Sequence, residues 1–188
     1  MPENKHSVCP WWYGYFLDNP IMRFLRKPDK TLKPYLKKGM TVLDIGCGMG
    51  LYSIAAAEIV GDGGKVYAVD LQEKMLRGLN KRAKRLNIAD RIETRNCISD
   101  TLCVDDIAGK VNFALAMHVV HEVPDQLKLF REVHSSLAPG GYLLVAEPSG
   151  HVSASEFEST LAIAKEAGFN KIDSPQVARS STALLEKQ

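Results

Sequence analysis

The chain has 188 residues, of which 45% are hydrophobic, and its 24 lysines and arginines nearly balance 22 aspartates and glutamates. This length and composition suit a single globular domain with one core. A net charge of +2 gives no signal of a protein that binds nucleic acid or a lipid surface, so we expect neither as a partner.

The cysteines and the apolar segments indicate a cellular compartment. Cys9, Cys47, Cys97 and Cys103 include no C-x-x-C pair and no zinc-ligand spacing, which favours a reduced, intracellular protein. The apolar patch near the N-terminus is short, aromatic and interrupted by Gly14, and no later run approaches the length of a membrane span. We therefore expect a cytoplasmic protein that holds no metal.

Apolar runs typical of strands alternate with amphipathic patterns typical of helices. In chain order, we expect strands at 40–45, 65–70, 91–96, 111–117 and 141–147, with helices near 50–60, 72–86, 124–137 and 153–167. Nearly continuous apolar strands separated by such helices indicate an α/β fold, a parallel sheet covered on both faces. The basic residues of the second helix have no aromatic residues among them, so we interpret them as a solvated helix face.

The segment VLDIGCGMG (residues 42–50) joins the first expected strand to the first helix and carries three alternating glycines, Gly46, Gly48 and Gly50. The dinucleotide-binding pattern G-x-G-x-x-G would need a glycine at residue 51, which is Leu51. Asp44 lies two residues before the first glycine, where a carboxylate would repel a pyrophosphate and attract an ammonium or sulfonium group. The turn therefore favours a cationic nucleoside, S-adenosylmethionine.

A second carboxylate follows the second expected strand. Asp70 lies 20 residues after Gly50, where an acidic side chain can accept hydrogen bonds from both hydroxyls of a ribose. Asp70 alone would fit a nicotinamide dinucleotide equally well, and it could also cap the helix that follows. The pair of Asp44 and Asp70 is what favours S-adenosylmethionine.

Four ordered segments, VLDIGCGMG, VYAVDLQEKML, VNFALAMHVVHEV and LAPGGYLLVAEP, carry a family resemblance over residues 40–147. The chain resembles class I S-adenosylmethionine-dependent methyltransferases, especially the small-molecule enzymes of the ubiquinone and menaquinone biosynthesis type. The resemblance implies a Rossmann-like, doubly wound sheet of seven mostly parallel strands, with residues 169–187 supplying a closing pair whose last strand is antiparallel. It also implies one methyltransferase domain over residues 1–188, with a helical and aromatic lid at 1–38 and a Rossmann-like core at 39–188.

The resemblance implies a set of cofactor-binding residues: Asp44, Gly46, Cys47, Gly48, Gly50, Asp70, Leu71, Met75, Asn96, Cys97 and Met117. Leu71 would lie against the adenine, with Met75 nearby. After the third strand the family often has an aspartate and a small residue that hold the adenine, and here Asn96 and Cys97 take those places. An amide oxygen of Asn96 and the backbone N–H of Cys97 could make the equivalent contacts.

The methyl acceptor is expected near the end of the fourth strand, where the sequence places His118, His121 and Glu122. His118 and His121 are the catalytic candidates, either as a wall of the acceptor site or as a general base; a structural cap and a metal site are the other interpretations. Glu147, at the end of the fifth strand, is either a substrate contact or a turn residue before Pro148. No Asn/Asp-Pro-Pro-aromatic motif occurs here, which counts against DNA adenine or protein glutamine as the acceptor.

Five aromatic side chains gather before the first expected strand: Trp11, Trp12, Tyr13, Tyr15 and Phe16. We expect Trp11, Trp12 and Tyr13 to contact the substrate as part of a lid, and packing over the sheet edge is the alternative. No large insertion occurs near the last strands, which suits a small-molecule acceptor and a monomer or homodimer.

The predicted activity is transfer of a methyl group from S-adenosylmethionine to a small molecule by in-line displacement. A thiol or metalloid methyltransferase and a non-catalytic S-adenosylmethionine-binding domain are the alternatives. A nicotinamide-dependent oxidoreductase is disfavoured by Asp44, by Leu51 and by the lack of a Tyr-x-x-x-Lys pair.

Overall fold

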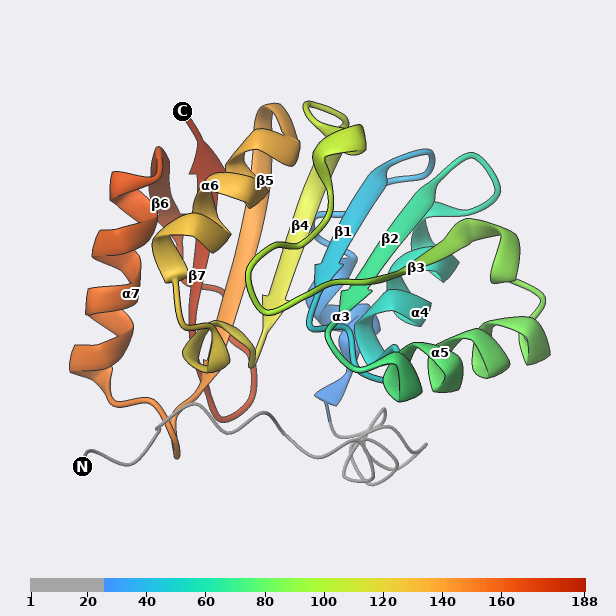
Figure 1. The fold of residues 1–188 in the computed structure, drawn as a ribbon, viewed down its shortest axis with the longest axis horizontal. Helices are drawn as coiled ribbons and strands as arrows, with labels where there is room; N and C mark the ends of the chain where they lie inside the picture. The colour runs from blue at the N-terminus through green and yellow to red at the C-terminus, as the bar shows by residue number, and fades with distance from the viewer. Residues whose placement is uncertain (1–25) are drawn as a thin grey trace.

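The computed structural model describes residues 26–188 (Figure 1), so the expectations for Trp11, Trp12 and Tyr13 lie outside the described residues. The strands of this part of the chain are β1 (Thr41–Ile45), β2 (Lys65–Asp70), β3 (Ile92–Asn96), β4 (Val111–Met117), β5 (Leu137–Pro148), β6 (Phe169–Asp173) and β7 (Ser180–Lys187). The helices are α3 (Pro28–Leu32), α4 (Leu51–Val60), α5 (Glu73–Arg85), α6 (Gln126–Ser136) and α7 (Ala154–Glu166). Short 3-10 turns form η1 (Ala89–Arg91), η2 (Asp105–Ile107) and η3 (Val120–Glu122).

The strands form one sheet in the order β3-β2-β1-β4-β5-β7-β6. Strands β1 to β5 pair in parallel, whereas β7 runs antiparallel to both β5 and β6. In Figure 1 the arrowheads of β1, β2 and β4 point towards the bottom of the view, and that of β7 points upwards. The expected sheet of seven mostly parallel strands with an antiparallel last strand is confirmed.

Helices cover both faces of the sheet, and each face has its own apolar core. Val42 of β1 packs in the core beneath α3, α4 and α5, whereas its neighbour Leu43 packs in the core beneath α6 and α7. Successive side chains of a strand point to opposite faces, so a strand covered on both sides must be apolar at nearly every position. This accounts for the continuous apolar runs in the sequence.

Strand β5 begins at Leu137, four residues earlier than its sequence pattern indicates. Leu137 pairs with Val111 of β4, and the register shifts before Phe113 pairs with Tyr142. The intervening Pro139-Gly140-Gly141 has the composition of a turn, and Gly140 adopts a left-handed conformation with φ 69°. Because β5 pairs with β4 on both sides of this register shift, the strand continues through residues whose composition predicts a loop.

Helix α5 shows the expected amphipathic pattern. Its buried residues are Met75, Leu76, Leu79 and Ala83. All its basic residues are exposed except Arg82, which is half-buried and donates a hydrogen bond to the Met49 carbonyl at 2.8 Å. Within residues 26–188, no helix combines the length and the apolar character needed to cross a membrane.

Candidate functional site

A cavity of about 560 Å³ opens at the carboxyl edge of the parallel strands, among the segments that follow β1, β2, β3 and β4. Strands β1 and β4 are neighbours whose following helices cover opposite faces, and such a switch point is where open α/β sheets bind ligands. The lining includes these predicted site residues: Asp44, Gly46, Cys47, Gly48, Asp70, Leu71, Met75, Cys97, Met117 and His118. Gly50, Asn96, His121 and Glu147 do not line it.

The glycine turn is tight for reasons of both conformation and space. Gly46 has φ 64°, and a Cβ at this position would lie 2.5 Å from a methyl carbon of Val119. Gly50 has φ 91°, and its Cβ would lie 2.2 Å from a methyl carbon of Leu79 on α5. The third glycine therefore allows α5 to pack against the turn. Gly48, with φ 56°, has no atom within 4 Å of where its Cβ would lie, so a side chain there would enter open space.

Asp70 is held in place by backbone N–H groups from both sides of the cavity. Its Oδ2 accepts a hydrogen bond from Gly48 N at 2.8 Å, and its Oδ1 accepts one from Gln72 N at 2.8 Å. Burial raises the pKa of Asp70, and these two bonds oppose that rise. Each carboxylate oxygen can accept a second hydrogen bond, so the carboxylate keeps the capacity to receive two hydroxyl donors.

Asp44 is the most deeply buried acid that lines the cavity, with 2% of its surface exposed. Ser53 of α4 donates a hydrogen bond to its Oδ2 at 2.5 Å. Burial raises the pKa of Asp44 to about 7, and the nearby charge of Asp70 also raises it. A buried carboxylate of this kind is stabilised by a cation, so the site suits an ammonium or sulfonium group.

Asn96 and Cys97 both donate hydrogen bonds within the protein. The amide nitrogen of Asn96 donates to the carbonyl oxygens of Asp70 at 3.0 Å and Leu71 at 2.9 Å. The backbone N–H of Cys97 donates to the Asp70 carbonyl at 3.1 Å, and this bond occupies the group expected to reach a purine nitrogen. Asn96 therefore shapes the loop that carries Leu71, and Cys97 lines the cavity.

A stretch that the sequence reasoning missed, residues 98–102, continues from Cys97 and forms one wall of the cavity. Glu132 of α6 holds this wall by accepting hydrogen bonds from Leu102 N at 2.7 Å and Thr101 Oγ1 at 3.2 Å. Ile98 is 61% exposed, which is unusual for an isoleucine and provides an apolar surface at the site. That apolar residue directly after a strand, at the carboxyl edge, was the signal available in the sequence.

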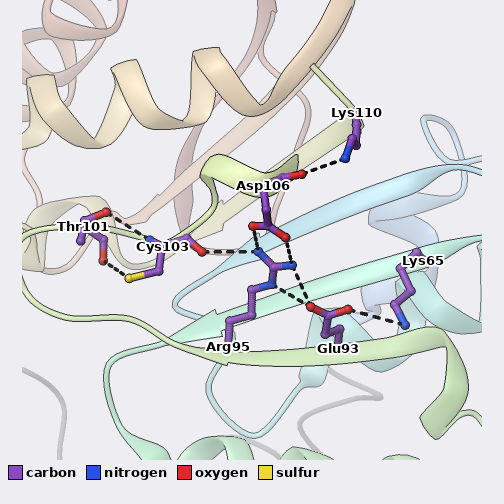
Figure 2. Close-up of polar contacts among 7 residues, drawn as sticks. All are labelled: Lys65, Glu93, Arg95, Thr101, Cys103, Asp106 and Lys110. Atoms are coloured by element: carbon purple, nitrogen blue, oxygen red, sulfur yellow. Dashed lines mark hydrogen bonds and ion pairs between the residues drawn. The ribbon is translucent and has the colours of Figure 1, made fainter. Parts of the chain in front are cut away.

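Figure 2 shows how the far side of the same loop is anchored. Arg95 of β3 binds Asp106 of η2 through both guanidinium nitrogens, at 2.5 and 2.8 Å, and donates to the Cys103 carbonyl at 3.4 Å. It also bonds Glu93 and lies over the ring of Tyr67, 4.5 Å from its centroid. The loop is therefore tied to β3 on one side and to α6 on the other.

His118 lies at the end of β4 in a left-handed conformation with φ 62°. Its Nδ1 lies 3.1 Å from a guanidinium nitrogen of Arg26, and its Nε2 lies 2.8 Å from Ser180 Oγ on β7. Burial lowers the pKa of His118 to about 4, and the Arg26 charge adds to this effect. The ring is therefore neutral, and both of its nitrogens are hydrogen-bonded.

The sequence reasoning also missed two cavity-lining residues, Arg26 and Tyr52.

His121 and Glu147 form a pair beneath the end of β4. Glu147 is 1% exposed; one carboxylate oxygen accepts a hydrogen bond from Val120 N at 2.8 Å and the other binds Nδ1 of His121. This hydrogen bond raises the pKa of His121. Among residues 26–188, no group of three His, Cys, Asp or Glu side chains is arranged to hold a metal ion.

Comparison with known proteins identifies the family. The family described as "Methyltransferase domain" matches residues 36–181. The chain belongs to this methyltransferase family. A crystal structure of an S-adenosylmethionine-dependent methyltransferase from Aquifex aeolicus has a TM-score of 0.83 to this chain, with 27% sequence identity over 95% of this chain and 98% of that one. The cofactor of this fold is S-adenosylmethionine, as expected.

Two curated relatives show which chemistry similar methyltransferases perform. A demethylmenaquinone methyltransferase of Geobacillus sp. is 27% identical over 78% of this chain and 64% of its own length. A ubiquinone biosynthesis O-methyltransferase of Caulobacter sp. is 35% identical over 75% of this chain and 52% of its own length. The chain spans between 29% and 64% of the length of the curated relatives it matches.

Proposed function

We propose that this methyltransferase transfers the methyl group of S-adenosylmethionine to a small-molecule acceptor. The observation that carries the proposal is the cavity, in which Asp44 and Asp70 lie beside an open glycine turn. When bound, S-adenosylmethionine supplies a sulfonium methyl group: the carbon–sulfur bond breaks as the acceptor–carbon bond forms, its electron pair stays on sulfur, and an acidic acceptor proton passes to a base or to water.

The residues present fit this cofactor by their chemistry. Asp70 retains hydrogen-bonding capacity for two ribose hydroxyls, and Asp44 supplies a buried negative charge for the cationic end. Leu71 and Ile98 present exposed apolar side chains suited to a purine. We assign the remaining contacts to Gly46, Cys47, Gly48, Met75, Cys97 and Met117, which line the cavity. Gly50 and Asn96 would act indirectly, by packing and by shaping the Leu71 loop.

For the acceptor, we assign different roles to the two histidines. His121 does not itself line the cavity, but its neighbour Glu122 does. We assign His121 as the proton acceptor from this adjoining position, because Glu147 orients its ring and raises its pKa. Glu147 is then a positioning residue rather than a substrate contact, since its carboxylate is buried against Val120 and His121. His118 forms part of the cavity wall.

A small acceptor is consistent with the size of the cavity, since about 560 Å³ must hold both the cofactor and the reacting part of the acceptor. Arg26, the first described residue, lies in the cavity wall. This supports the proposal that Trp11, Trp12 and Tyr13 contribute to the acceptor site as a lid over the core at 39–188.

The thiols of Cys47 and Cys97 line the cavity, and burial raises the pKa of both, to about 11 for Cys97. Cysteine binds soft metals and metalloids as the thiolate, so a raised pKa makes loss of the proton on binding more costly. This weighs against a metalloid held by these two cysteines, and we favour an organic acceptor.

Titration calorimetry of the purified protein with S-adenosylhomocysteine, followed by a screen of hydroxylated aromatic, amine and thiol acceptors for methyl transfer, tests this function. We expect binding of S-adenosylhomocysteine, no comparable binding of NAD(H) or NADP(H), and turnover of one acceptor class. Binding of the dinucleotides instead would overturn the proposal, and tight binding without turnover of any acceptor would favour the non-catalytic alternative.

A further inference from the structure

Tyr52 has a buried hydroxyl group that the fold itself does not use. It lies in the first turn of α4, it is 5% exposed, and it lines the cavity. Among the residues that the structure describes, its hydroxyl has no hydrogen-bond partner. A buried hydroxyl without a partner is costly in a folded protein and commonly marks a place where a ligand or an ordered water binds.

Arg26 brings a positive charge to the same cavity. Its guanidinium lies 3.1 Å from Nδ1 of His118, and no carboxylate within residues 26–188 forms an ion pair with it. Because His118 is neutral and shares its other nitrogen with Ser180, it orients the guanidinium without neutralising it. Among the described residues, the guanidinium makes no hydrogen bond besides the one to His118, and its five N–H donors suit an anionic partner.

Asp44 completes a set of three polar groups at this end of the cavity. Tyr52 is followed by Ser53, whose hydroxyl binds Asp44 at 2.5 Å, and Tyr52, Arg26 and Asp44 line the same cavity. Burial raises the pKa of Tyr52 to about 12; the charge of Arg26 lowers this pKa and the charge of Asp44 adds to the rise. The Asp44 carboxylate suits an ammonium group, whereas the guanidinium and the hydroxyl suit a carboxylate. An α-amino acid carries both charges on adjacent atoms.

We propose that Tyr52 and Arg26 form a carboxylate-binding subsite that acts with Asp44 to recognise the α-amino-acid end of S-adenosylmethionine. The inference rests on the proposed function and deepens it, because it assigns a role to two residues that no sequence motif identified. His118 acts as a positioning residue that holds Arg26, which explains why both of its ring nitrogens are committed within the protein. Ser180 of β7 thereby connects the closing strand pair to the cofactor site.

The subsite can be tested by comparing two ligands that share the adenosine thioether. S-adenosylhomocysteine carries the amino acid, and 5′-methylthioadenosine lacks it. Replacing Tyr52→Phe should weaken S-adenosylhomocysteine binding by about ten- to a hundredfold in calorimetry, because a hydrogen bond to a charged group is lost. Binding of 5′-methylthioadenosine should change by less than about twofold.

Tyr142→Phe is the matched control, because Tyr142 of β5 is half-buried and does not line the cavity. It should bind both ligands as the wild type does. The melting temperature of ligand-free Tyr52→Phe should equal or exceed that of the wild type, since the hydroxyl has no partner among the described residues to lose. Arg26→Gln should show the same ligand selectivity, with Arg77→Gln on the exposed face of α5 as its control.

Unchanged S-adenosylhomocysteine affinity in Tyr52→Phe and Arg26→Gln would overturn the inference while leaving the proposed function intact. An equal loss for both ligands would also overturn it, because the residues would then act on the nucleoside. Failure of the wild-type protein to bind either ligand would instead contradict the proposed function itself.

Discussion

Glu147 at the end of β5 binds Nδ1 of His121 in η3, across the end of strand β4. The other oxygen of the same carboxylate accepts a hydrogen bond from Val120 N, so the backbone holds one oxygen while the second binds the imidazole. A carboxylate held in this way determines which ring nitrogen carries the proton and stabilises the charged ring. The pair therefore couples the end of the central sheet to the proposed acceptor side of the cavity.

Replacing Glu147→Gln should lower the pKa of His121, because the hydrogen bond and charge that raise it are removed. The His121 pKa can be measured by NMR titration of the imidazole protons, with His121→Gln used to assign its signal. If His121 accepts the acceptor proton, the acidic limb of the pH–rate profile should move to lower pH by the same amount. Glu186→Gln on β7 is the control, and an unmoved acidic limb would remove His121 from the reaction.

The His121 pair also predicts a pH dependence of stability. The folded-state pKa of His121 is raised above the unfolded value, so its contribution is fully present below about pH 6.5 and is lost as the pH rises through the folded-state pKa. Denaturation in urea across this range should show a smaller loss of stability for Glu147→Gln than for the wild type. Equal pH profiles would contradict the pairing.

Asp44→Asn should weaken cofactor binding and raise the stability of the ligand-free protein. The pKa of Asp44 is about 7 in the folded chain, against 3.8 when unperturbed, so its contribution to folding is lost as the pH rises from about 4 to 7. Above this range the variant should be more stable than the wild type by up to about 4 kcal/mol, because no charge is buried. The amide oxygen of the variant can still accept the hydrogen bond from the Ser53 hydroxyl. Its affinity for S-adenosylhomocysteine should fall, and retained affinity would contradict the role of Asp44 as a cation receptor.

Asp70→Ala should weaken S-adenosylhomocysteine binding by about 2–3 kcal/mol, or about thirty- to over a hundredfold, as expected for charge-assisted bonds to a ribose. The substitution also removes the bonds to Gly48 N and Gln72 N, so some loss of folding stability should accompany it. Asp70→Asn provides the comparison, because an amide oxygen preserves one acceptor. Calorimetric titrations that match the wild type would remove Asp70 from the cofactor site.

Two glycines of the same turn should respond differently to alanine. Gly50→Ala introduces a Cβ 2.2 Å from Leu79, so we expect a loss of about 2–4 kcal/mol in the free energy of unfolding from overpacking and backbone strain. Gly48→Ala meets no atom within 4 Å and should lose about 1 kcal/mol through strain alone, yet its methyl group would obstruct the cofactor. Thermal unfolding and calorimetry separate the two effects; equal stability of the variants would contradict the packing role of Gly50.

Deletion of residues 1–16 tests the proposed aromatic lid. The truncated chain keeps every described element and should fold, as measured by circular dichroism, while losing cofactor affinity or turnover. Both tryptophans of the chain, Trp11 and Trp12, lie in the deleted segment, so the fluorescence of the full-length protein should change when S-adenosylhomocysteine binds. Full activity of the truncated chain, or fluorescence that does not change when the ligand binds, would contradict the lid and favour the alternative, packing over the sheet edge.

Local patterns in the sequence were sufficient to predict the five parallel strands, their covered faces and two acids, Asp44 and Asp70, that line the cavity. Strands buried on both faces must be continuously apolar, and helices on a sheet must be amphipathic, so each element carries its own signal. The order of chain segments then places Asp44 and Asp70 at one edge, because parallel strands end together. The antiparallel closing pair followed from the family resemblance.

Tertiary structure decided what the individual side chains do. Arg26 is 92 residues from His118 in the sequence, and Ser180 is 62 residues from it on the other side, so no local pattern could show that His118 is bound by both. The amide nitrogen of Asn96 and the carboxylate of Glu147 both bind groups that lie far away in the sequence. A polar side chain has many possible partners, and the one it binds depends on which distant backbone and side-chain groups the folded chain brings within hydrogen-bonding distance.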